Sequence, residues 1–265
     1  MDFHRFTPLN PQSAIRNPDK DIKVIGRELG VSFILGGSVR KIENDIRITA
    51  QLIKAKTGNH VWADTYDGKY TEKLFEFQGD VAKRVANSLK AVLTKEEMQR
   101  IGKNPTANLA AHDLYLKANN FLNKYIETRD LSSYHTAINL YKSVLELDSA
   151  YARDYTGLAG AYFIRYQWDD LFKGNYVGSV RTLAERALLI DDQLDEAYYL
   201  RGKYFKENGQ IEEALLNYDK ALEINPNLSP SIYDIGYIYL LVKNDYVKGL
   251  KNIHKYLDLC YGPER

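Results

Sequence analysis

The side chains best suited to chemistry in this sequence are five histidines and one cysteine, and they form no known catalytic or metal-binding pattern. The histidines stand singly rather than at metal-ligand spacing. The lone Cys260 has no partner for an internal disulfide or a cysteine-based zinc site, and we expect it to be buried on a helix as a small apolar side chain. We therefore expect no catalytic residue and no bound metal. The histidines are His4, His60, His112, His135 and His254.

The run Gly36-Gly37-Ser38 is the nearest approach to a phosphate-binding loop. It lacks the Lys-Ser/Thr ending and the strand-to-helix context that such a loop needs. A bulge or a close helix contact explains the two glycines better. We therefore expect no cofactor.

A candidate ligand pocket comes from four polar and aromatic residues that alternate with other residues near position 60. Alternate residues of a strand point to the same face. They could line a small pocket on one side of a strand, and ordinary packing of a sheet face is the alternative. The four residues are His60, Trp62, Asp64 and Tyr66.

The elements around these residues predict a small α+β domain. Asp19 or Asp21 can cap a helix over residues 22–29 that ends at Gly30. Alternating and β-rich stretches then predict three strands in a β-meander, and a period of three and four residues predicts a helix that covers its apolar face. The expected strands are residues 31–42, 46–52 and 60–66, and the expected helix is residues 72–93.

The second half carries spaced small and bulky residues typical of a helical hairpin. In the stretch that begins at Asp195, small Gly202 and Ala214 allow two antiparallel helices to approach, and Tyr218 fills the gap beside them. Pro226 then ends the second helix because it has no amide N–H. The same spacing recurs before and after this stretch, which indicates about four hairpins.

This pattern resembles the tetratricopeptide repeat over about residues 109–261. The resemblance implies an all-α, right-handed superhelical solenoid, since at least about three stacked repeats bury a continuous core. Compared with the usual repeat, the first two hairpins carry extra residues. We expect these as long inter-helix insertions at residues 124–133 and 166–175.

In the tetratricopeptide family the first helix of each hairpin lines a groove. The resemblance implies that this groove binds a protein or peptide, with aromatic rings supplying area and two lysines attracting a carboxylate. The clamp for chaperone tails is disfavoured, because Tyr115 and Leu200 replace its lysine and an asparagine. The expected groove residues are Tyr115, Asn119, Phe163, Tyr199, Lys203, Lys206, Tyr233 and Tyr237.

Residues 25–66 carry a second ordered set of glycines, polar residues and aromatic residues. Its members are Gly26, Glu28, Leu29, Gly30, Gly37-Ser38-Val39-Arg40, Ile48-Thr49-Ala50-Gln51-Leu52, Thr57-Gly58, Trp62 and Tyr66.

This set resembles the TolB-like α/β domain that precedes tetratricopeptide repeats in bacterial regulators fused to cyclase, kinase or DNA-binding domains. Members of that family begin with an apolar strand and a long helix that this sequence lacks, so we expect an incomplete domain. Asn104-Pro105-Thr106 is the expected boundary. The predicted domains are residues 1–103, TolB-like, and residues 104–265, tetratricopeptide.

The sequence therefore favours a non-enzymatic interaction module, the sensory or scaffolding part of a bacterial regulator. The alternative is a small-molecule or nucleotide sensor with its ligand in the α/β domain. A net charge of +1 does not suit nucleic-acid binding, and no apolar run is long enough to span a membrane. We expect a cytoplasmic location, or a periplasmic one behind an upstream transmembrane segment. Uncovered surfaces at the sheet edge and at the C-terminal hairpin predict a homodimer.

Overall fold

The computed structural model describes residues 21–43, 45–70, 73–89, 98, 101, 103–168 and 176–261. The chain divides into two compact units. One comprises Met1–Asn104 with Leu257–Arg265, and the other comprises Pro105–Tyr256. No described helix combines the length and the apolar composition that crossing a membrane requires.

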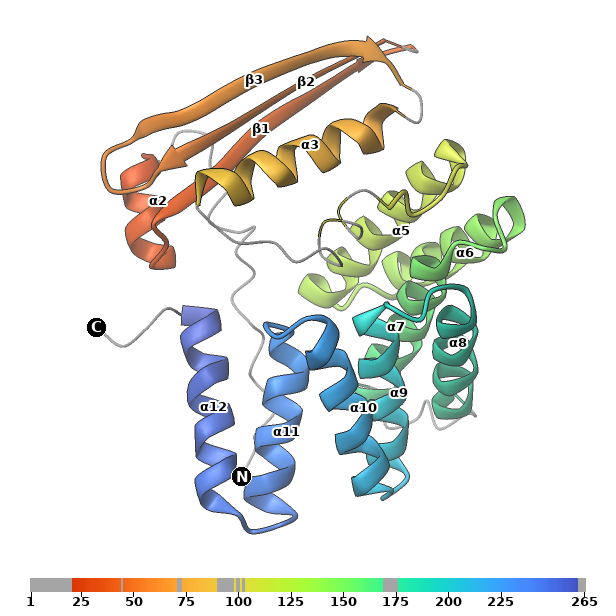
Figure 1. The fold of residues 1–265 in the computed structure, drawn as a ribbon. Helices are drawn as coiled ribbons and strands as arrows, with labels where there is room; N and C mark the ends of the chain where they lie inside the picture. The colour runs from red at the N-terminus through yellow and green to blue at the C-terminus, as the bar shows by residue number, and fades with distance from the viewer. Residues whose placement is uncertain are drawn as a thin grey trace. The chain divides into compact units, whose positions relative to one another are not determined.

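The first unit contains a three-stranded antiparallel sheet of order β1-β2-β3, which confirms the predicted meander (Figure 1). Helix α2 precedes it, with its N-terminus capped by Asp21 and its end at Gly30 in the left-handed conformation. Gly36 and Gly37 lie in regular pairing with β2, so they form neither the bulge nor the helix contact expected for them. The elements are α2 Ile22–Leu29, β1 Phe33–Ile42, β2 Asp45–Lys54, β3 Asn59–Lys69 and α3 Lys73–Ser88.

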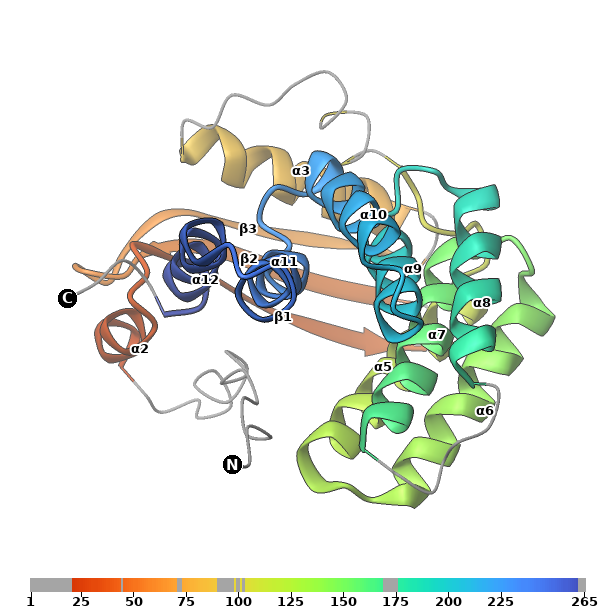
Figure 2. The ribbon, with the colours of Figure 1, turned by 90° about the horizontal axis from the view of Figure 1, so that it is seen from below.

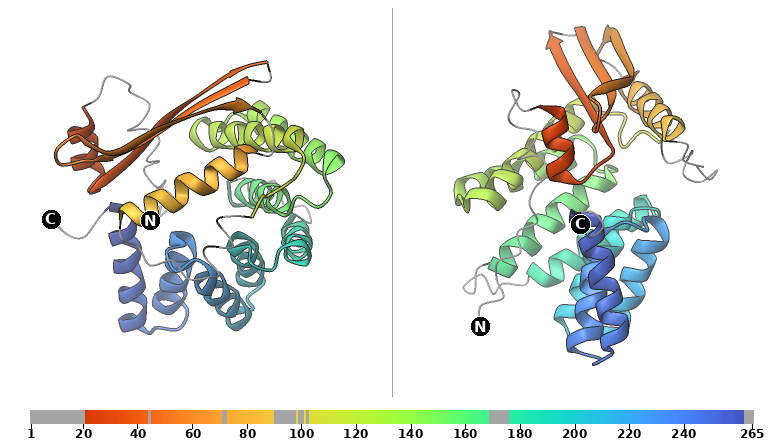
Figure 3. Two further views of the ribbon diagram at one scale, coloured as in Figure 1. Left: turned by 45° about the horizontal axis from the view of Figure 1, so that its top comes forward. Right: turned by 90° about the vertical axis from the view of Figure 1, so that its left-hand side faces the viewer.

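Helix α3 covers one face of this sheet (Figures 1 and 3). Leu74 of α3 packs with Ile46 and Ile48 of β2, and all three side chains are buried. Tyr66 of β3 stacks on Phe77 of α3, with ring centroids 5.1 Å apart. The helix expected over residues 72–93 is described as α3, and residues 90–97 lie outside the described part.

The sheet register shifts between Leu52 and Ile53. Leu52 pairs with Trp62 of β3, but Ile53 pairs with His60, so Val61 is an extra residue in β3. Neighbouring residues of a strand point to opposite faces, and paired residues share a face. His60 is therefore out of line with Trp62, contrary to the expectation from simple alternation.

From Leu109 on, the described chain is a series of antiparallel helical hairpins, as the repeat pattern predicts (Figure 2). First helices contact each other along the series, α5 with α7 and α7 with α9. The hairpins are α5 Leu109–Thr128 with α6 Leu131–Leu147, α7 Ala152–Trp168 with α8 Tyr176–Ile190, α9 Asp195–Glu207 with α10 Ile211–Ile224, and α11 Ser229–Leu241 with α12 Tyr246–Tyr261.

The expected insertion in the first hairpin is wrong. Only Arg129 and Asp130 connect α5 to α6, and the extra residues lengthen α5 instead. Asp130 caps α6 by accepting from the backbone N–H groups of Ser132 and Ser133, which allows the short turn. In the second hairpin, α7 ends at Trp168, and residues 169–175 lie outside the described part.

The lone cysteine also differs from expectation. Cys260 is exposed rather than buried. It lies in the last turn of α12, and no later helix follows among the described residues. A further hairpin would be the natural cover for the open side of a terminal repeat.

Within and between the hairpins, tyrosine rings pack directly on glycines of the first helices. A methyl group at Gly202 would lie 2.5 Å from Cε1 of Tyr218, and one at Gly157 would lie 2.6 Å from Cε1 of Tyr141. Both tyrosines are fully buried, so neither ring has free space to move into. These contacts allow the close helix approach predicted for Gly202.

We predict that Gly202→Ala lowers the stability of the second unit. Overpacking against the Tyr218 ring costs about 1–3 kcal/mol, which outweighs a helix-propensity gain of roughly 1 kcal/mol. Gly160→Ala on α7 is the matched control, because no atom lies within 4 Å of its added methyl group. Urea unfolding followed by circular dichroism measures both, and an unchanged or higher midpoint for Gly202→Ala would contradict this packing.

Candidate functional site

All eight predicted groove residues lie on first helices of the hairpins. Tyr233 and Tyr237 on α11 are each 38% exposed, whereas Phe163 and Lys203 are buried. We call this set the first-helix surface. Its members are Tyr115 and Asn119 of α5, Phe163 of α7, Tyr199, Lys203 and Lys206 of α9, and Tyr233 and Tyr237 of α11.

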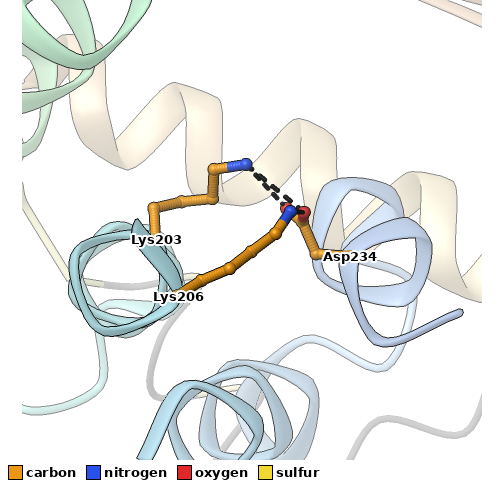
Figure 4. Close-up of polar contacts among 3 residues, drawn as sticks. All are labelled: Lys203, Lys206 and Asp234. Atoms are coloured by element: carbon orange, nitrogen blue, oxygen red, sulfur yellow. Dashed lines mark hydrogen bonds and ion pairs between the residues drawn. The ribbon is translucent and has the colours of Figure 1, made fainter. Parts of the chain in front are cut away.

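The centre of this surface is an ion cluster between α9 and α11 (Figure 4). Lys203 Nζ donates to Oδ1 and Oδ2 of Asp234 at 3.3 Å and 3.1 Å, and Lys206 Nζ donates to Oδ1 at 2.5 Å. The side chains of Asp234 and Lys203 are almost fully buried, and that of Lys206 is 18% exposed. Two cations thus share one carboxylate.

Aromatic rings surround the two amines of the cluster. Lys203 Nζ lies 4.9 Å from the centroid of the Phe163 ring and 5.9 Å from that of Tyr199. Lys206 Nζ lies 4.6 Å from the centroid of the Tyr237 ring. Cation–π attraction at these distances stabilises amines that have lost part of their hydration.

The cluster changes the acidity of its members. Burial acts to raise the pKa of Asp234, but attraction and hydrogen bonds from Lys203 and Lys206 prevail and hold the pKa below its ordinary value. Burial lowers the pKa of Lys203, and Asp234 offsets part of that effect. With both amines protonated, the cluster carries one positive charge in excess.

Asp234 was not among the residues predicted from the sequence. Asp234 lies between the buried residues Ile232 and Ile235. An acidic residue within an apolar stretch of a helix is the sequence feature that could have marked it as a buried, paired carboxylate. Its presence alters the expectation for the lysines. An internal carboxylate already engages both amines that were expected to attract a partner's carboxylate.

The other end of the first-helix surface holds a second buried carboxylate, Asp154 on α7. Asp154 is fully buried, and neither of its oxygens has a hydrogen-bond partner among the described residues. Burial raises its pKa to about 8. Nearby, the hydroxyl of Tyr141 donates to Oδ1 of Asn119 at 2.6 Å, so this predicted groove residue is engaged within its own hairpin.

Three of the four residues of the predicted sheet pocket, Trp62, Asp64 and Tyr66, lie on one face of β3, and His60 does not. Asp64 forms an ion pair with Arg84 of α3, and Tyr66 stacks on that helix, so both join the sheet to α3. Trp62 Nε1 is buried without a hydrogen-bond partner among the described residues. His60 is separated from them by the shift at Val61.

A hollow of about 510 Å³ lies on the same sheet, and of the four predicted residues only Asp64 lines it. No group of three or more potential metal ligands occurs among the described residues. The residues lining the hollow are Gly37, Ser38, Thr49, Ala50, Gln51, Ala63, Asp64 and Thr65.

Comparison with known proteins identifies the repeat. Residues 195–228 match the family model of the tetratricopeptide repeat, which is the hairpin α9–α10 with the start of α11. The chain therefore contains a tetratricopeptide repeat, and a three-stranded sheet precedes its series of helical hairpins.

Two curated relatives cover different shares of the chain. The chain is 31% identical over 208 residues, 77% of its length, to "Putative adenylate cyclase 3" of Rhizobium meliloti (strain 1021). It is 39% identical over 67 residues, 24% of its length, to photosystem I assembly protein Ycf3 of Acaryochloris marina (strain MBIC 11017). The matches span only 34% and 40% of those two proteins.

Solved structures show more distant likeness. MamA from Desulfovibrio magneticus RS-1 is 18% identical with a TM-score of 0.42, and the match covers 71% of this chain and 93% of that one. The second TPR domain of human RPAP3, solved with an HSP70 peptide, is 17% identical with a TM-score of 0.36, over 54% of this chain and 98% of that one. At these values the likeness says nothing about the ligand of this chain.

We predict that Asp234→Asn strongly destabilises the second unit. It leaves two buried or partly buried amines without their counter-charge, at a cost of about 3–5 kcal/mol. Glu212→Gln is the control, since Glu212 pairs with Lys243 through a side chain that is 77% exposed. This substitution should change the free energy of unfolding by less than about 0.5 kcal/mol. Urea midpoints at pH 7 measure both.

The pH dependence of the same variant follows from the lowered pKa of Asp234. The carboxylate stabilises the fold above its unfolded pKa and ceases to do so as the pH falls through its folded pKa. The stability difference between the parent and Asp234→Asn should therefore be constant at neutral pH and shrink below about pH 4. A difference that stays the same down to the acid transition would refute the ion cluster.

For Asp154 we predict the opposite dependence of stability on pH. Its folded pKa of about 8 lies above the ordinary value, so the folded state holds the proton longer and loses stability as the pH rises between about 4 and 8. The expected loss is at most about 1.4 kcal/mol for each pH unit. Asp154→Asn removes this slope, and urea unfolding of both proteins across that pH range measures it. Parallel profiles would show that Asp154 does not titrate in this way.

Proposed function

We propose that this chain is a non-enzymatic interaction module that binds a protein or peptide on its first-helix surface. The observation that carries the proposal is the pair of exposed rings, Tyr233 and Tyr237, beside the excess positive charge of the cluster at Asp234. Tyrosine rings supply contact area at a small entropy cost, and they are enriched at binding hot spots.

The charge of the cluster supports an acidic partner over a basic one. Lys206 is the more exposed of the two amines, and its Nζ lies beside the Tyr237 ring. A partner carboxylate that approaches Tyr237 would meet the uncompensated charge without displacing Asp234. A basic side chain in the same place would be repelled.

We further propose that the module is the sensory or scaffolding part of a bacterial signalling regulator. The similarity to "Putative adenylate cyclase 3" supports a signalling context. The 208 matched residues exceed the length of the helical unit, Pro105–Tyr256, so the similarity reaches into the sheet unit as well.

The binding proposal predicts that Tyr233→Ala with Tyr237→Ala weakens peptide binding by at least about tenfold, as expected for loss of hot-spot rings. The probe is a peptide selected against the parent protein from a random display library, and fluorescence anisotropy measures its affinity. Both rings are partly exposed, so we expect the thermal midpoint to change little.

Tyr246→Ala is the matched control for this experiment. Tyr246 is 61% exposed and opens α12, outside the first helices. Its loss should leave peptide affinity unchanged. Equal affinity of the parent and the Tyr233/Tyr237 variant would refute the proposed surface, as would failure of the library to yield any binder.

A further inference from the structure

Among the described residues, β1 is an edge strand of the sheet. Phe33–Ile42 pair with β2 along one side, and no described strand lies along the other. Alternate residues of an edge strand direct their backbone N–H and C=O groups outward, where another strand can pair with them. The outward N–H and C=O groups of β1 can therefore be paired by another strand.

The face of the sheet that carries the core is incompletely covered at β1. Leu35 pairs with Leu52, and Val39 pairs with Ile48, so both β1 residues lie on the core face. The β2 residues are buried, whereas Leu35 is 51% and Val39 is 68% exposed. An occupant of the edge should thus bring apolar side chains to the same face.

A second copy of β1 meets both requirements. A two-fold axis perpendicular to the joined sheet keeps the core faces of both copies on the same side, so core-face residues pair with core-face residues. The axis must then lie where one residue of β1 is opposite the same residue of the second copy. An axis at Gly37 places Leu35 opposite Val39 of the second copy, and Val39 opposite Leu35 of the second copy. Each exposed apolar side chain gains an apolar neighbour.

The positive charges of β1 favour the same register. With the axis at Gly37, Arg40 lies opposite Ile34 of the second copy, and Lys41 lies opposite Phe33. An axis at Arg40 would instead place the two Arg40 side chains directly opposite each other, which is unfavourable. We propose that two copies of this chain pair through antiparallel β1 edges about an axis at Gly37, giving a homodimer with one continuous sheet.

Light scattering after size exclusion tests the dimer. The mass should rise from 30.4 kDa toward twice that value as the loading concentration increases. Leu35→Lys with Val39→Lys should restore the monomer at all concentrations, because each lysine would face a lysine of the second copy across the edge. Circular dichroism checks that this variant is folded.

A control on the C-terminal hairpin separates this contact from another source of association. Val247 and Leu250 of α12 are 82% and 52% exposed, and their double lysine variant should remain dimeric. A parent that stays at the monomer mass at the highest concentration overturns the proposal. So does a dimer that is lost in the α12 variant but kept in the β1 variant.

Disulfide trapping tests the register. In a Cys260→Ser background, Leu35→Cys with Val39→Cys should form a covalent dimer on mild oxidation, since each new thiol faces another across the axis. Leu35→Cys alone should stay uncrosslinked, because its thiol faces Val39 of the second copy. Equal crosslinking of the single and double variants would overturn the axis at Gly37.

Discussion

The helical unit depends on the packing of buried tyrosine rings against glycines at the points where helices cross. Tyr218 covers Gly202 within the third hairpin, and Tyr141 covers Gly157 between the first and second. A side chain in either glycine position would force the helices apart, because the rings are fully enclosed. This close approach determines which residues of successive first helices can meet.

The ion cluster of α9 and α11 is a consequence of that approach. Buried ion pairs are rarely favourable compared with apolar packing of the same volume, but they strongly disfavour arrangements that separate the partners. Lys203 and Lys206 are one helical turn apart and converge on Asp234. We infer that the cluster fixes the pairing of the third and fourth hairpins, while its excess charge remains available at Lys206, next to the exposed rings of α11.

The sheet unit depends on the alternation of apolar and polar residues along its strands. Its core face alternates regularly from Ile46 to Leu52 and is closed by α3, whereas its other face carries polar pairs such as Arg47 with Asp67. The same alternation continues on β1, where Leu35 and Val39 keep the apolar pattern without being covered. Exposed apolar residues on an edge strand, beyond the part of the sheet that α3 covers, are typical of a surface that pairs with another strand.

The sequence by itself determined the elements whose causes are local. Asp21 and Gly30 delimit α2, and the small and bulky positions around Gly202 define the repeat. Caps, helix periodicity and strand alternation act within a few residues, so they can be read along the chain.

Only the tertiary structure decided what depends on residues far apart in the sequence. Asp234 meets Lys203 across 31 positions, and no short-range pattern relates them. The extra residue at Val61 reversed the face of His60, because strand register is set by pairing with β2 and not by alternation within β3. The exposure of Cys260 likewise depends on what packs against α12, which a helix pattern alone does not specify.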